Sequence, residues 1–174
     1  MKILILYATH GGVTRVCAQM LAEQLHVRHD VTLLDIKEKA PAPSDYEIVV
    51  LGSCVRMAKI DKEIKKYIKA HCDVLSNMPT AVFLCCGFTR NFPDYVDTQI
   101  PKQLQCSLGI HCFGGELKPE KLHGFDKLAV WFMRNSIKSR ELGEKHTEVY
   151  SLPEILPENI ALLADKIRDV VFNK

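Results

Sequence analysis

The sequence predicts a doubly wound α/β fold, in which helices cover both faces of a five-stranded parallel sheet with the strand order 2-1-3-4-5. The first observation is that short, uniformly apolar runs, typical of strands buried on both faces, alternate five times with segments of helical periodicity. The second is that no repeat, low-complexity segment or linker interrupts this alternation over 174 residues. Right-handed crossovers and this length favour the five-stranded order over a longer sheet. We expect one three-layer domain covering residues 1–174.

The expected strands are apolar runs that cover residues 3–6, 31–34, 48–52, 81–85 and 110–114. The run at 48–52 is apolar throughout, which places it near the centre of the sheet. Pro41 and Pro43 mark the loop that precedes it.

The expected helices are recognised by apolar residues at helical spacing. The first has such a face at Val16, Cys17, Met20, Leu21 and Leu25. Asp61 is placed to cap the second, in which Ile64, Tyr67 and Ile68 are apolar and the lysines face solvent. Residues 94–105 predict a weaker helix, which Pro101 should kink or shorten, and residues 125–138 predict another. Pro157 suits the first turn of the last helix.

The bulk composition fits a globular protein, with 47% hydrophobic and 25% charged residues. A net charge of +2 is too mild to indicate a nucleic-acid partner. The opening apolar run is too short for a signal peptide, and no stretch is long enough to span a bilayer. We therefore expect a cytoplasmic protein with at most peripheral membrane contact.

Seven cysteines are scattered through the chain without a C-x-x-C pair. The sequence therefore lacks the spacing typical of zinc sites and thioredoxin-like centres, and we predict no metal site. Reduced thiols agree with the expected compartment. We predict that the adjacent Cys85 and Cys86 face opposite sides of a strand rather than forming a redox disulfide.

A short loop of hydroxyl-bearing and small residues follows the first strand, between Thr9 and Thr14. Gly11 and Gly12 allow the backbone to approach a ligand closely, and the next helix directs its free N–H groups and its positive dipole end into this loop. The same residues also fit an ordinary tight turn. The loop matches neither G-x-G-x-x-G nor G-x-x-x-x-G-K-[ST], which argues against dinucleotide and P-loop sites.

The spacing of Thr9, Gly12 and Thr14 resembles the phosphate loop of flavodoxins, whose usual pattern is S/T-x-T-G-x-T. Gly11 stands where a threonine is usual, so one hydroxyl donor is lost. The resemblance implies a flavodoxin-like fold and an FMN cofactor. In such sheets the ligand lies beyond the carboxyl ends of the strands, between strands one and three.

Other segments are similar, in the same order, to the menaquinone-dependent protoporphyrinogen oxidases, which are flavodoxin-fold FMN proteins. Residues 51–57 resemble their I-G-A-S-I-R-Y, and residues 77–81 resemble their N-S-M-P-S-A. Residues 114–117 and 125–127 resemble their G-A-L and Y-D-R.

The resemblance implies three groups of cofactor-binding residues. The FMN phosphate would lie on the N–H groups of His10, Gly11, Gly12, Val13 and Thr14, helped by the hydroxyls of Thr9 and Thr14. One side of the flavin ring would meet Ser53, Cys54, Val55, Arg56 and Met57. The other side would meet Cys86, Gly87, Phe88 and Thr89.

Several of these residues have two interpretations. His10 is a phosphate donor or a solvated loop residue, and Arg56 neutralises a reduced flavin or forms a surface ion pair. Phe88 stacks on the flavin or caps the fourth strand from the core. Residues 131–133 dock a quinone, a membrane surface or a partner, or they pack on the sheet. No side chain is assigned as a catalytic acid or base.

Two departures from the oxidase pattern bear on the substrate. The segment 87–105 is shorter than the basic insertion of those enzymes and holds only Arg90 and Lys102 as cations, and Met57 replaces an aromatic residue. The sequence therefore predicts an FMN-dependent oxidoreductase whose partner is a quinone or a redox protein, with a porphyrin as a further candidate substrate. The alternatives are a pure one-electron carrier and a flavodoxin-fold interaction protein that has lost FMN.

Overall fold

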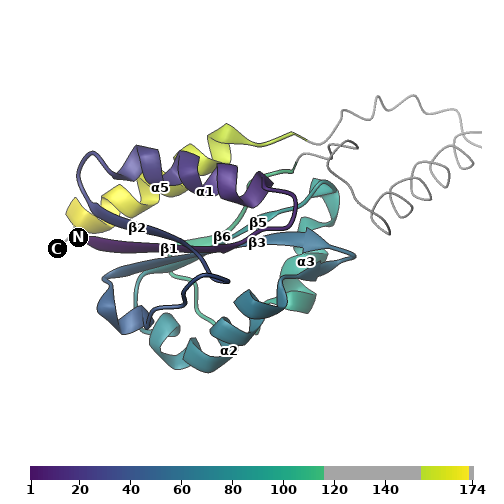
Figure 1. Cartoon of the computed structure of the whole chain (residues 1–174), viewed down its shortest axis with the longest axis horizontal. Helices are drawn as coiled ribbons and strands as arrows, with labels where there is room; N and C mark the ends of the chain where they lie inside the picture. The colour runs from purple at the N-terminus through teal and green to yellow at the C-terminus, as the bar shows by residue number, and fades with distance from the viewer. Residues whose placement is uncertain (116–153, 173–174) are drawn as a thin grey trace, which may run out of the picture. The chain divides into compact units, whose positions relative to one another are not determined.

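A computed structural model of the chain describes residues 1–115 and 154–172 (Figure 1). It contains a parallel sheet in the order β2-β1-β3-β5-β6. These strands are β1 (Lys2–Ala8), β2 (Asp30–Asp35), β3 (Ile48–Arg56), β5 (Thr80–Cys85) and β6 (Gly109–Cys112). Numbering only the parallel strands gives 2-1-3-4-5, so the predicted fold and strand order are confirmed.

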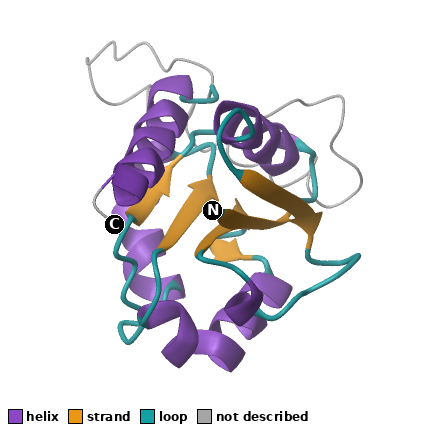
Figure 2. Ribbon diagram, turned by 90° about the vertical axis from the view of Figure 1, so that its left-hand side faces the viewer, coloured by secondary structure: helices purple, strands orange, loops and turns teal. Residues whose placement is uncertain are grey.

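Helices lie on both faces of the sheet (Figures 1 and 2). One face is covered by α1 (Val13–Leu25) and α5 (Pro157–Phe172), and the other by α2 (Lys62–Ser76) and α3 (Phe92–Gln99). Two short 3-10 turns, η1 (Pro43–Asp45) and η2 (Thr89–Asn91), lie in the connections. In the described residues, no helix is long and apolar enough to cross a bilayer.

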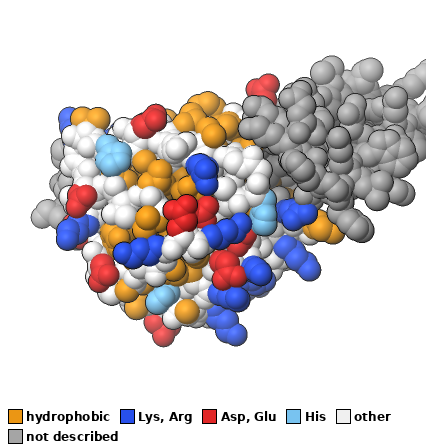
Figure 3. All heavy atoms as spheres, in the orientation of Figure 1, with side chains coloured by type: hydrophobic (Ala, Val, Ile, Leu, Met, Phe, Trp, Pro, Cys, Tyr) orange, Lys and Arg blue, Asp and Glu red, His pale blue; other side chains and the backbone are white. Residues whose placement is uncertain are grey.

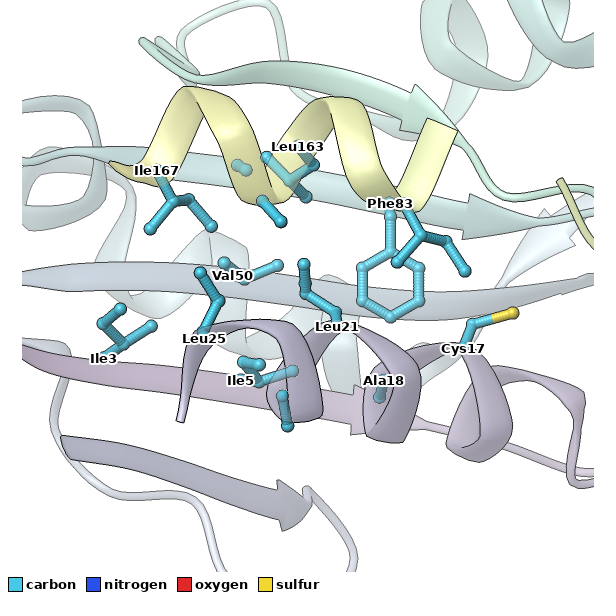
Figure 4. Close-up of a cluster of buried hydrophobic side chains, with 14 of the residues drawn as sticks. Ile3, Ile5, Cys17, Ala18, Leu21, Leu25, Val50, Phe83, Leu163 and Ile167 are labelled. Atoms are coloured by element: carbon cyan, nitrogen blue, oxygen red, sulfur yellow. The ribbon is translucent and has the colours of Figure 1, made fainter. Parts of the chain in front are cut away.

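Alternation along the strands builds one hydrophobic core on each face of the sheet. The core beneath α1 and α5 is shown in Figure 4, where Ile5 of β1, Val50 of β3 and Phe83 of β5 meet Leu21 and Leu163 of the two helices. All five side chains are fully buried. Cys85 lies in this core and Cys86 in the core on the opposite face, which confirms that the two adjacent cysteines face opposite sides.

The capping predictions for the helices are also confirmed. The Asp61 carboxylate accepts a hydrogen bond of 2.8 Å from the Glu63 amide at the start of α2, and Pro157 is the first residue of α5. The lysines at 62, 65, 66 and 69 are exposed. Figure 3 shows Lys and Arg side chains interspersed with Asp and Glu on the face in view, in keeping with the mild net charge.

The expectation that Pro101 shortens the third helix is confirmed. The helix ends at Gln99 rather than at residue 105, because the residue before Pro101 is driven out of the helical region and Ile100 is extended. The predicted end of the third strand, in contrast, is wrong. The third strand continues to Arg56 instead of ending at residue 52, and the chain returns in a two-residue antiparallel strand, β4 (Lys59–Ile60). The predicted helix at 125–138, with residues 131–133, and the segments 116–117 and 125–127 lie outside the described residues.

The register between β1 and β3 brings the carboxyl ends of these two central strands to the same level. Leu6 of β1 is level with Leu51 of β3, and Ala8 is level with Ser53. The loop after β1 and the last part of β3 are therefore held side by side at one edge of the sheet. This edge contains the predicted phosphate loop.

Candidate functional site

The turn from β1 into α1 is built by Gly12. This glycine is left-handed, with φ of +88°, a conformation that other residues adopt at a cost of about 1–2 kcal/mol. Its amide donates a 3.0 Å hydrogen bond to the Thr9 hydroxyl, which keeps its own proton for a ligand. No side chain caps α1, so the N–H groups of its first turn are available. A methyl group added at Gly11 or Gly12 would meet nothing within 4 Å, so the turn borders open space.

Thr14 in the first turn of α1 is fully buried, yet its hydroxyl has no hydrogen-bond partner among the described residues. Its neighbour is the thiol of Cys85. A hydrogen bond with Cys17 and burial raise the pKa of Cys85, and a weak interaction of the Thr14 hydroxyl with this thiol, outside regular hydrogen-bond geometry, opposes the rise. A buried hydroxyl without a partner costs folding free energy, about 1–3 kcal/mol, which a ligand oxygen can recover. The open glycine turn and the free N–H groups of α1 fit an anion such as the FMN phosphate, and the Thr14 hydroxyl, which has no regular hydrogen-bond partner, lies in the first turn beside them.

His10 connects the first loop to the start of α2. Its Nε2 lies 3.2 Å from Oδ2 of Asp61, whose side chain is only 4% exposed. The Asp61 amide in turn donates 2.9 Å to the hydroxyl of Ser53 at the level of Ala8. His10 therefore forms an ion pair when protonated, which differs from both interpretations suggested by the sequence. This chain of contacts fixes the first loop against the second.

The backbone of His10 is also engaged, because its amide faces the sulfur of Cys54. Burial raises the pKa of that thiol, the Asp61 carboxylate raises it further, and the His10 amide opposes both effects. One of the five predicted phosphate-binding amides is thus directed at a thiol.

The second predicted segment forms a tight hairpin. Met57 and Ala58 have φ of 50° and 59° between the antiparallel strands β3 and β4. A turn with two left-handed residues usually contains Asn or Gly, so the backbone of this hairpin is strained. Because neither residue is present here, the sequence did not predict a turn at this position. Met57 is 73% exposed and Arg56 is exposed. The Ser53 hydroxyl, which donates to the Cys54 carbonyl, is already used within the protein.

The third predicted segment begins where β5 ends. The Cys86 side chain is only 2% exposed and packs in the core, which argues against the predicted contact of this side chain with the flavin ring. Its amide donates 2.7 Å to the carbonyl of Gly114, and a methyl group at Gly115 would lie 2.8 Å from the Gly87 nitrogen. Phe88 is 39% exposed, which argues against the core interpretation of this ring.

Two cations near the first loop were missed from the sequence. Lys37, just beyond β2, donates 3.2 Å from Nζ to the Thr9 carbonyl. Arg15 donates from Nε to the Tyr7 hydroxyl at 3.1 Å and lies 3.8 Å from the Asp35 carboxylate. The available signal was their position at the carboxyl edge of the sheet, where ligands of such folds bind. Lys37 adds a positive charge beside the predicted phosphate position.

This fold and this glycine turn define a flavodoxin-type protein. The profile of the flavodoxin domain family matches residues 4–142, and the chain belongs to this family. Two solved structures share the fold at low identity. An oxidoreductase from Corynebacterium diphtheriae aligns over 100% of this chain and 98% of its own, with 14% identity and a TM-score of 0.57. The flavodoxin of Streptococcus pneumoniae TIGR4 aligns over 100% of both chains, with 15% identity and a TM-score of 0.52.

Among curated proteins, the chain is similar to two quinone-type protoporphyrinogen IX dehydrogenases. The Leishmania major protein is 38% identical over 87 residues, which are 47% of this chain and 37% of that protein. The Escherichia coli K12 protein is 33% identical over 86 residues, which are 48% of this chain and 47% of that protein. The similarity thus spans less than half the length of each relative.

Proposed function

We propose that this protein binds FMN at the carboxyl edge of β1 and β3 and acts as a flavin-dependent oxidoreductase. The observation that carries the proposal is the open glycine turn at the start of α1, beside the buried, unpartnered hydroxyl of Thr14. A helix N-terminus and a desolvated donor favour a bound phosphate over water.

The phosphate would be held by the amides of Gly11, Val13 and Thr14 and by the hydroxyls of Thr9 and Thr14, with the Gly12 amide orienting Thr9 and Lys37 supplying charge from the rim. The ring would lie between the β3–β4 hairpin and the segment at Gly87–Thr89. When bound, FMN supplies the electron transfer, and the protein supplies orientation and charge. Exposed Met57 and Phe88 are the side chains with apolar surface to offer to a flat ring.

The substrate class follows from the relatives and from charge. The similarity to quinone-type protoporphyrinogen dehydrogenases supports a quinone as electron acceptor. A porphyrin carries carboxylates that require cations, and the segment 87–105 contains only Arg90 and Lys102 as cationic residues. We therefore rank quinone reduction above protoporphyrinogen oxidation.

FMN binding is the first prediction. Purified protein titrated with FMN should show the two visible flavin bands in a saturable complex that survives gel filtration, and FMN fluorescence should change on binding. Riboflavin, which has no phosphate to place on the glycine turn, should bind at least about ten-fold more weakly. The absence of binding at high FMN would refute the enzyme and the carrier proposals together.

Quinone reactivity is the second prediction, and it separates an enzyme from a carrier. Photoreduced holoprotein mixed anaerobically with a soluble menaquinone analogue should be reoxidised at a rate that saturates with quinone concentration. Reduced free FMN with the same quinone is the control, and its rate should not saturate. A stabilised semiquinone with only slow, unsaturable reoxidation would contradict the enzyme proposal and favour a one-electron carrier.

One observation favours the remaining alternative, an interaction protein without FMN. Gly11 provides no hydroxyl, and the His10 amide is directed at the Cys54 sulfur, so the loop has fewer donors than the family pattern. The FMN titration distinguishes this alternative directly.

A further inference from the structure

Two cysteines from neighbouring strands lie next to each other behind the third loop. The sulfur atoms of Cys86 and Cys112 are 3.7 Å apart. Cys112 is the last residue of β6 and is level with Leu84 of β5. Because side chains alternate along a strand, Cys86 lies on the same face as Leu84, and it is packed in the core against Cys112. A disulfide of about 2.05 Å therefore requires the two sulfurs to approach by less than about 2 Å.

The two thiols differ in access to solvent. Cys86 is 2% exposed, whereas Cys112 is partly exposed. A small molecule therefore reaches Cys112 first, and Cys86 is the thiol behind it.

The two thiols also differ in acidity. The hydrogen bond with Cys86 and, to a smaller extent, the Gly114 amide lower the pKa of Cys112 to about 7, against the opposing effect of burial. The same hydrogen bond and burial raise the pKa of Cys86. Thiolates are the nucleophiles of sulfur exchange, and the best attacking thiol has a pKa near the ambient pH. Cys112 is therefore suited to the first nucleophilic attack on a disulfide, and Cys86 to the second attack, which closes a disulfide within the protein.

We propose that Cys86 and Cys112 form a dithiol–disulfide site that exchanges with small-molecule disulfides. The Cys112 thiolate attacks one sulfur of the small disulfide, whose S–S bond breaks and releases the first thiolate. Cys86 then loses its proton to solvent and attacks the Cys112 sulfur, which expels the second thiolate. The small disulfide is reduced by two electrons to two thiols, and the protein dithiol is oxidised to one disulfide. The proposal is independent of FMN binding.

The chain contains suitable reference thiols. Cys17 and Cys85 also form a hydrogen-bonded pair, but they are 0% and 5% exposed. Cys106 is partly exposed like Cys112, but burial raises its pKa to about 11. A reaction governed only by proximity would also oxidise Cys17 with Cys85, and a reaction governed only by access would modify Cys54, Cys72 and Cys106 as readily as Cys112.

The test uses the full chain without FMN, equilibrated with mixtures of reduced and oxidised glutathione and then mapped by mass spectrometry of non-reduced peptides. We expect a Cys86–Cys112 disulfide that a dithiol reagent reverses. Cys86→Ser should stop the reaction at a glutathione adduct on Cys112, and Cys112→Ser should give neither product. Cys106→Ser should behave like wild type. At pH 7, iodoacetamide should label Cys112 roughly ten-fold or more faster than Cys106.

The peptide map of the wild-type chain decides the proposal even if a serine variant fails to fold. Unmodified Cys86 and Cys112 across the whole glutathione range would overturn it. A Cys17–Cys85 or Cys72–Cys106 disulfide formed in preference to Cys86–Cys112 would overturn it as well.

Discussion

Replacing Gly52 with alanine is expected to lower the free energy of unfolding by about 1–3 kcal/mol, the usual cost of overpacking a dense core. A methyl group at this position in β3 would overlap the Phe83 ring. That ring cannot move aside easily, because it is fully buried and stacks on Phe113 with 4.4 Å between ring centroids. Urea unfolding should show a lower midpoint with an unchanged slope.

A second substitution tests the cause. Phe83→Leu should itself destabilise the protein, but combined with Gly52→Ala it should cost less than the sum of the two single changes. Gly11→Ala is the matched control, because a methyl group there meets nothing within 4 Å, and it should change the unfolding free energy by less than about 0.5 kcal/mol. Strict additivity of the two changes would show that the ring is not the obstacle.

Replacing Thr14 with valine is expected to weaken FMN binding by roughly ten-fold or more, the equivalent of about 1.5–3 kcal/mol for a hydrogen bond to a charged group. Valine keeps the shape of threonine and removes the hydroxyl. Because that hydroxyl is buried and without a partner in the free protein, the apoprotein should be no less stable than wild type. Riboflavin affinity should be almost unaffected.

Thr80→Val is the reciprocal control. Thr80 is equally buried, but it starts β5 at the opposite edge of the sheet, and its hydroxyl donates 2.7 Å to the Leu75 carbonyl. This variant should lose about 1–3 kcal/mol of stability and keep its FMN affinity. Equal losses of FMN and riboflavin affinity in Thr14→Val would show that the loop does not hold the phosphate.

The fold was predictable because its causes are local. Apolar runs and helical stripes identified all five parallel strands, and alternation placed Cys85 and Cys86 on opposite faces. The cap at Asp61 and the position of Pro157 were read from single residues with known helix-end preferences. The end of the third helix before Pro101 was also expected from a single residue, whereas the error at the end of the third strand arose because a strained hairpin extends the strand beyond its apolar run.

The candidate site was predictable in its location and only partly in its contacts. The sequence placed Gly12 and Thr14 at the start of the first helix, since strand, loop and helix follow one another along the chain. It did not show that His10 meets Asp61, that Lys37 reaches Thr9, or that the sulfurs of Cys86 and Cys112 are neighbours. These contacts join segments that are far apart in sequence, and strand register together with helix packing brings them together. Local periodicity thus determines which elements form, whereas long-range packing decides which polar groups meet and which, like the Thr14 hydroxyl, remain without a partner.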